Sequence, residues 1–253
     1  MKRISRFFPP AAVGRERAEH HYSTVHHPFA RRLLRDHGDR VLSYATNRAD
    51  LQYSLSGRLE EEPTAWRFVI LEVDDQLPDA TGYLPPWVQP LLWTDHAKCI
   101  ERMDAWEVEA RTLVDRRCGQ NTSAKYLFLY GAGRPEEAEA RRLRYLTEHV
   151  PRLAALMSAA FGARLYTSNR VLREAETSDD FGSGASYTGG YRSEAALIAI
   201  DELYFDNVEW AADLLGSAEA VALLRDSVLG RLEGYQVHEV LGVDKREPLS
   251  PAT

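Results

Sequence analysis

An internal repeat constrains this chain of 253 residues more than any other feature of its sequence. Residues 20–48 read HHYSTVHHPFARRLLRDHGDRVLSYATNR, and residues 144–170 read RYLTEHVPRLAALMSAAFGARLYTSNR. Each segment has a tyrosine four residues before a histidine, a proline two residues after that histidine, and the pattern Tyr-x-x-Asn-Arg at its end. The spacing changes by only one residue between the segments, so we interpret the chain as two diverged copies of one module.

The hydrophobic pattern predicts the same order of elements in both copies. The apolar runs ISRFF and KYLFLYG predict a first strand, and an amphipathic helix follows each run. Gly38 and Gly162 mark the predicted ends of these helices. Asp95 and Asp206, at the end of matching Leu-aromatic-x-Asp motifs, are predicted to cap a second helix. Further strands are predicted at residues 40–46 and 163–168, at Trp66–Val73 and Glu194–Asp201, within Trp106–Arg117, and at Tyr235–Val243.

The resulting order, β-α-β-β-α-β, is that of the ferredoxin-like split βαβ unit. Such a unit has helices on one face of its sheet, so its other face needs a cover. The sequence therefore predicts an α+β fold in which two fused ferredoxin-like units, residues 1–119 and 124–246, pack sheet to sheet as an intrachain α/β barrel.

Charge and cysteine content narrow the setting in which the protein works. The formal net charge is −7, and the arginines are interleaved with acidic residues, which argues against a nucleic-acid partner. A membrane span needs about 20 predominantly apolar residues in a row, and the sequence has no such run. The two cysteines, Cys99 and Cys118, are too few for a disulfide framework, so we expect a cytoplasmic protein.

The repeated motifs resemble those of a known family. The pattern Tyr-x-x-x-His-x-Pro, then Tyr-x-x-Asn-Arg, then Leu-aromatic-x-Asp is similar to the EthD-like branch of the dimeric α/β-barrel superfamily. The second copy, with GRPEEAEARRLRYLTEHVPRL and LIAIDELYFDNVE, matches better than the first. That superfamily also holds antibiotic-biosynthesis monooxygenases and small polyketide cyclases. The resemblance implies the barrel fold, and family members include cofactor-free oxygenases, cyclases and proteins with no assigned activity.

Each repeat offers one histidine that could act as a general base. Tyr22 and His26, like Tyr145 and His149, are four residues apart and so share a face of a helix. A histidine titrates near neutrality, which suits the removal of a proton from a phenol or enol. Either histidine could instead satisfy buried backbone groups at the end of its helix.

Amide and aromatic side chains supply the candidate binding residues. Asn47 and Asn169 could donate to a substrate carbonyl or a developing oxyanion, or could simply form turns. Aromatic rings stack on flat ligands, although each could equally be part of the core. Two long irregular segments, 74–90 and 174–192, could cover a site. The aromatic candidates are Tyr44, Tyr166, Trp66, Trp93, Tyr204 and Tyr191.

Several cofactor signals fail. His20, His21, His26 and His27 contain no pair at helical metal-ligand spacing, and YGAGRPEE lacks the third glycine of a dinucleotide loop. We therefore expect no metal and no cofactor. The leading hypothesis is a cofactor-independent oxygenase for an aromatic, polyketide-like small molecule of specialised metabolism, with molecular oxygen as co-substrate. The alternatives are a cyclase or isomerase of the same substrate class and a non-catalytic binding protein, and a homodimer remains open.

Overall fold

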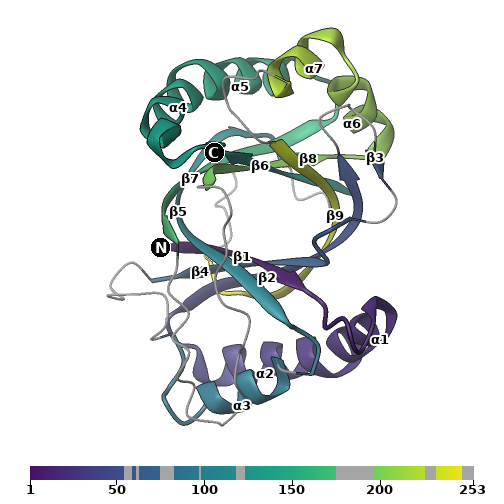
Figure 1. Ribbon diagram of the computed structural model, residues 1–253, viewed down its shortest axis with the longest axis vertical. Coiled ribbons are helices and arrows are strands. Elements are labelled where there is room, and N and C mark those ends of the chain that lie inside the picture. The colour runs from purple at the N-terminus through teal and green to yellow at the C-terminus, as the bar shows by residue number, and fades with distance from the viewer. Residues whose placement is uncertain are drawn as a thin grey trace, which may run out of the picture.

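An antiparallel β-barrel forms the centre of the molecule (Figure 1). The computed structural model describes residues 1–53, 59–60, 63–74, 83–96, 98–117, 123–174, 197–225 and 232–246. Eight of the described strands close the barrel in the order β2-β4-β1-β5-β7-β8-β6-β9, with β9 paired back to β2 and the short β3 added at the edge of β2. Their bounds are β1 Lys2–Phe8, β2 Val41–Tyr53, β3 Leu59–Glu60, β4 Arg67–Val73, β5 Arg102–Asp115, β6 Ala124–Gly131, β7 Ala163–Glu174, β8 Leu197–Phe205 and β9 Leu232–Asp244.

The helices lie outside the barrel in two groups (Figure 1). One group comprises α1 (Arg15–His21), α2 (His27–His37) and α3 (Gln89–His96). The other, on the opposite side, comprises α4 (Ala138–Arg144), α5 (Val150–Ala159), α6 (Val208–Leu215) and α7 (Ala218–Leu224). None of the helices in the described ranges is both long and apolar enough to cross a bilayer.

The two halves of the chain contribute equally to the barrel. Residues 2–115 supply the order β2-β4-β1-β5, and residues 124–244 supply β7-β8-β6-β9. If the short β3 is left out of the count, the second strand of each half is followed across the sheet by its third, first and fourth. The halves join where β5 pairs with β7 and β2 pairs with β9, and both pairings are antiparallel. The predicted α+β class and barrel are confirmed.

Two predicted helix caps are wrong. Asp95 lies in the last turn of α3, and Asp206 follows β8, which runs through residues 203–205. Residues 203–205 pair with β6 and β7 and so extend the strand. The residue that caps α6 is Asn207, whose Oδ1 accepts a hydrogen bond from the Trp210 N–H at 2.9 Å.

A π-helical turn interrupts the first helix of each half, at Tyr22–His26 and Tyr145–His149. The amide of the residue after each turn donates to the tyrosine carbonyl five residues back. Proline follows two residues after each histidine, and a proline ring collides with the carbonyl four residues earlier in a regular helix. The wider turn accommodates this proline, and it carries a tyrosine and a histidine at its two ends, both buried.

Alternation along β1 separates the barrel interior from the side that faces the helices. Ile4 packs inside the barrel against Phe68 and Trp106. Its neighbours Arg3 and Ser5 point the other way, towards α2 and α3. The helix-facing side of this sheet holds the candidate site.

Candidate active site

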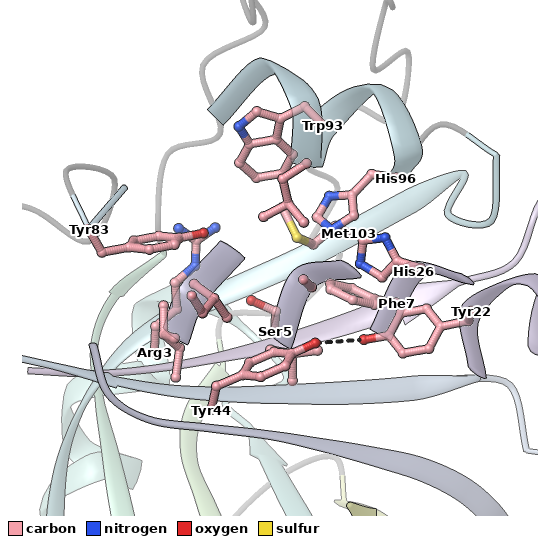
Figure 2. A pocket seen from close by; sticks show the side chains of 15 residues that line it. Arg3, Ser5, Phe7, Tyr22, His26, Tyr44, Tyr83, Trp93, His96 and Met103 are labelled. Carbon is pink, nitrogen blue, oxygen red and sulfur yellow. Dashed lines mark hydrogen bonds between the residues drawn. The ribbon is translucent and has the colours of Figure 1, made fainter. Parts of the chain in front are cut away.

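A buried cavity lies between the sheet of the first half and helices α2 and α3, with the π-helical turn at one end (Figure 2). Its volume is about 50 Å³. One water needs roughly 10–15 Å³ of such space, so the cavity holds a few waters and is smaller than one aromatic ring. Strands β1, β2, β4 and β5 form its floor and helices α2 and α3 its roof. The lining residues are Arg3, Ser5, Phe7, Tyr22, His26, Ala30, Leu34, Tyr44, Val69, Leu71, Tyr83, Leu92, Trp93, His96 and Met103.

A histidine that lines this cavity is paired with an aspartate outside it. Asp95, 69 residues away on α3, lies with Oδ2 2.8 Å from Nδ1 of His26. The hydrogen bond from His26 holds the pKa of Asp95 well below its usual range, so the carboxylate is ionised and can only accept. Nδ1 therefore carries the proton, and Nε2 of His26 is the nitrogen with a free lone pair.

Burial sets the protonation state of His26. Its side chain is only 2% exposed, and this desolvation lowers its pKa, although Asp95 acts in the opposite direction. The His96 ring lies with its centroid 4.6 Å from that of His26, and burial lowers the pKa of His96 further. Both rings are thus neutral at pH 7, which is the state a proton acceptor requires.

Asp95 is held by a second set of contacts on its other oxygen. His21 Nε2 lies 3.0 Å and Lys98 Nζ 3.3 Å from Oδ1. These contacts fix the carboxylate from the outer side while His26 occupies the inner side. The arrangement resembles the carboxylate–histidine pair of hydrolases, in which the acid fixes the tautomer and orientation of the base.

Two tyrosines close the cavity beside the histidine. The hydroxyls of Tyr22 and Tyr44 lie 3.4 Å apart, and the Tyr22 ring is 4.8 Å from the His26 ring. Burial raises the pKa of Tyr22 to about 12 and also raises that of Tyr44 well above its usual value. Both remain neutral phenols at pH 7 and can donate a hydrogen bond to a ligand oxygen. Behind Tyr22, Trp66 packs edge-on with its ring centroid 5.3 Å away.

The far end of the cavity carries a positive charge. Arg3 rises from β1 beside Tyr83, away from His26 and His96 (Figure 2). Arg3 is 6% exposed. In the described ranges no carboxylate forms an ion pair with its guanidinium and no hydrogen bond to it is made.

The equivalent region of the second half is a packed polar cluster. Asp201 Oδ1 accepts hydrogen bonds from the hydroxyls of Tyr145 and Tyr166, the latter at 3.3 Å. Nε2 of His149 lies 3.0 Å from the Tyr130 hydroxyl and 3.5 Å from Asp201 Oδ2. The protein itself therefore engages Nε2 of His149, whereas no described residue forms a hydrogen bond with Nε2 of His26.

Strand register explains why one side is open and the other filled. Ser5 pairs with Val69, and Phe128 pairs with Asp201, so these two pairs occupy equivalent places in the two sheets. By the same register, Arg3 in the first half is equivalent to Tyr126 in the second, and Phe7 is equivalent to Tyr130. Three large rings in β6 thus occupy the places of Arg3, Ser5 and Phe7. The serine leaves the space that forms the cavity.

The predicted site residues fall into separate groups. Tyr22, His26, Tyr44 and Trp93 line the cavity, and Trp66 stands behind it with Nε1 donating to Glu19 Oε2 at 2.8 Å. Tyr145, His149 and Tyr166 belong to the second-half cluster. Tyr191 lies outside the described residues.

Asn47, Asn169 and Tyr204 lie inside the barrel, away from the cavity. The Asn169 amide donates to the Ile200 carbonyl at 2.9 Å and to Glu202 at 3.1 Å. Tyr204 donates to Glu239 at 3.1 Å. Asn47 is fully buried and, by strand alternation from Tyr44, faces the same interior.

Sequence reasoning missed Arg3, His96 and the role of Asp95. Arg3 sits in a run that reads only as an apolar strand, so its direction depends on the register. Asp95 was noticed, but as a helix cap. Its partnership with His26 depends on how α3 packs against α2, which no local pattern reveals. Among the described residues no cluster of histidine, cysteine and acidic side chains could hold a metal ion.

Comparison with known proteins reveals the fold but no sequence relative. No family model and no curated protein sequence matches the chain. A solved structure of an anthrone oxidase-like protein superposes with a TM-score of 0.53 at 11% identity, covering 98% of this chain and 96% of its own. A candidate monooxygenase from Fusobacterium nucleatum subsp. nucleatum superposes with a TM-score of 0.51 at 8% identity, covering 95% of this chain and 92% of its own. At such identities the likeness shows a shared barrel fold.

Proposed function

We propose that the chain is a cofactor-independent oxygenase that uses His26 as a general base on an aromatic, weakly acidic small molecule. One observation carries the proposal: a neutral histidine, oriented by an ionised Asp95, lines a buried cavity walled by aromatic rings. A phenol, an enol or a doubly benzylic ketone such as anthrone has a proton that such a base can remove. The names of the two barrel neighbours, anthrone oxidase-like and candidate monooxygenase, agree with this chemistry.

The proposed reaction begins with proton transfer from the substrate to Nε2 of His26. The imidazolium that forms is stabilised by Asp95, and the substrate anion receives hydrogen bonds from Tyr22 or Tyr44. The anion transfers one electron to molecular oxygen, and the radical pair combines to form a carbon–oxygen bond. His26 returns its proton to the peroxide, which loses water. For a CH₂ group the products are one carbonyl and one water, so the balance closes with oxygen as the oxidant.

The volume of the cavity favours a non-catalytic binding protein as the second candidate. A cavity of about 50 Å³ holds no polycycle as it stands, and even an engineered cavity that admits benzene measures about 150 Å³. An oxygenase for a polyketide-like substrate must therefore open by movement of Trp93 or Tyr83 on the roof. A cyclase would use the same base and anion without oxygen.

We further infer that the barrel arose by tandem duplication of a ferredoxin-like unit within the EthD-like branch. The equivalent strand orders and the π-helical turn at the same place in each half support this inference. Two independent units would have little reason to share so rare a turn. Superposition of residues 2–115 on 124–244 should bring Tyr22 onto Tyr145, and a non-equivalent placement of the two would contradict the duplication.

The decisive experiment measures oxygen uptake by the purified protein with anthrone, without added flavin, haem or metal. We expect uptake and anthraquinone formation, with one oxygen atom from ¹⁸O₂ in the new carbonyl. His26→Gln should abolish both, while Arg48→Gln, an exposed arginine paired with Asp50, serves as the control. Anion formation without oxygen uptake would favour the cyclase, and ligand binding without turnover would favour the binding protein.

A further inference from the structure

We infer that Arg3 is an anion-binding residue and that the cavity takes an aromatic ligand that bears a carboxylate. This inference rests on the proposed function for the identity of the site, and it extends it to the class of ligand. Three observations carry it: the burial of Arg3, the absence of a counter-ion among the described residues, and the position of Arg3 at one end of the cavity.

A buried guanidinium without a carboxylate is expensive for the folded protein. Proteins pair such charges or bind a ligand that does so, because desolvation is otherwise uncompensated. The other buried arginine on this side of the sheet shows the usual solution: Arg67 contacts both oxygens of Glu19 at 2.7 and 2.8 Å. Arg3 has no equivalent of Glu19 in the described ranges.

The neighbours of Arg3 do not neutralise it. Burial raises the pKa of Tyr83, so this residue is a neutral phenol rather than a phenolate. Burial lowers the pKa of His96, so this ring is uncharged as well. The charge of Arg3 therefore remains available to a ligand that enters the cavity.

Geometry defines the shape of the ligand. Arg3 and Phe7 are four residues apart on β1, which places their backbones roughly 13 Å apart at ~3.3 Å per residue. The proposed base, His26, lies at the Phe7 end of the cavity. The ring centroids of Phe7 and His96 are 5.9 Å apart, and those of His96 and His26 are 4.6 Å apart. Once Trp93 or Tyr83 has moved to widen the cavity, a ligand would thus place its anionic group at Arg3 and its acidic proton at His26, with its ring between them.

The guanidinium selects the kind of anion. Its planar fork of N–H groups matches the two oxygens of a carboxylate, which gives charge-assisted hydrogen bonds in pairs. The second half offers no such group at the equivalent place, where Tyr126 donates to Gln236 at 3.2 Å. Among the described residues, only the first half therefore has a guanidinium at this position of the sheet.

Calorimetric binding of benzoate and its uncharged isostere benzamide tests the inference. We expect the wild-type protein to prefer benzoate by about tenfold or more, the usual gain from a charged hydrogen-bond pair. Arg3→Gln should remove this preference and leave benzamide affinity within about threefold. Arg3→Lys should retain part of it, and Arg48→Gln should retain all of it. An unchanged preference in Arg3→Gln would overturn the inference, as would equal wild-type binding of the two probes.

A second variant separates binding from folding. Arg3→Met removes the buried charge while preserving the volume of the stem, so the melting temperature in the absence of ligand should stay equal or rise. A marked fall in melting temperature with benzoate binding intact would show that Arg3 is structural. Binding requires no turnover, so these outcomes are independent of the oxygenase test. Oxygen uptake with uncharged anthrone would persist if only the anion site were absent.

Discussion

The two halves of the barrel place the same tyrosine and histidine in opposite environments. In the first half His26 is oriented by Asp95 and lines a cavity. In the second, His149 is engaged by Tyr130 and Asp201 inside a cluster of phenols. A shared motif therefore specifies the local π-helical turn, while the residues on neighbouring strands decide what that turn can do.

Three positions on one strand account for much of this difference. Arg3, Ser5 and Phe7 in β1 correspond by register to Tyr126, Phe128 and Tyr130 in β6. Gly234 provides the room for the Phe128 ring, since a Cβ there would lie 2.6 Å from Phe128 Cε1. The first half has Ala105 at this place and a serine opposite it. We interpret the first half as the one that binds the ligand and the second half as the one that supports it structurally.

The largest expected difference between the halves concerns the two histidines. His26→Ala should reduce turnover by roughly 100- to 10,000-fold, the usual contribution of a general base. His149→Ala should leave turnover within a few-fold and reduce the free energy of unfolding by about 1–3 kcal/mol, because its buried hydrogen-bond partners lose their contact. Oxygen-uptake kinetics and urea denaturation of both variants check this. Small, equal rate losses in both variants would refute a histidine base.

The second-largest effects are expected when the residue that fills the second-half site and the residue that leaves the first-half cavity open are exchanged. Phe128→Ser should lower the free energy of unfolding by about 3–5 kcal/mol, as truncations of buried phenylalanines do, with turnover per folded molecule unchanged. Ser5→Phe with Ala105→Gly transfers the second-half pair to the first half. This double variant should block ligand binding. Its free energy of unfolding should change by about 1–3 kcal/mol at most. Retained turnover in this double variant would place the reaction elsewhere.

Asp95→Asn should have a smaller effect on rate and a characteristic effect on pH dependence. An amide no longer fixes the tautomer of His26, so turnover should fall by roughly 10- to 100-fold, the range found when the hydrogen-bond partner that orients a metal-bound histidine is removed. Asp95 raises the pKa of His26 against the lowering by burial. Its removal should shift the acid limb of the kcat/KM profile to lower pH. A shift to higher pH, or an unshifted limb, would contradict the assignment of His26 as base.

The repeat predicted the barrel and one wall of the site, and no more. Tyr22 and His26 were placed correctly on one helix face because their spacing is a local property. Asn47 and Asn169 share the repeat but lie inside the barrel, because strand alternation turns them away from Tyr44 and Tyr166. Arg3 and Asp95 acquire their meaning from contacts between distant segments. Such contacts depend on register and helix packing, which a single sequence does not specify.

The smallest expected contrast concerns acid stability. Burial lowers the pKa of His27 to about 4, with Arg67 acting in the same direction, and the ring stacks on Tyr44 at 5.7 Å. Between about pH 4 and pH 6.5 His27 is thus neutral in the folded state, whereas it binds a proton in the unfolded chain. Its contribution to stability is complete above pH 6.5 and is lost as pH falls towards 4, with a slope of at most about 1.4 kcal/mol per pH unit.

His27→Val tests this contribution, because valine is the residue that the second half carries at the matching position, Val150. The variant should flatten the dependence of unfolding free energy on pH between 6.5 and 4, and should leave the curve above pH 7 parallel to that of the wild type. His26 and His96 also have lowered pKa values, so part of the slope should persist. Urea denaturation at a series of pH values measures both slopes. An unaltered slope in His27→Val would show that His27 is protonated in the folded protein, and the acid sensitivity of the first half would then come from other groups with lowered pKa values, among them His26, His96 and Glu19.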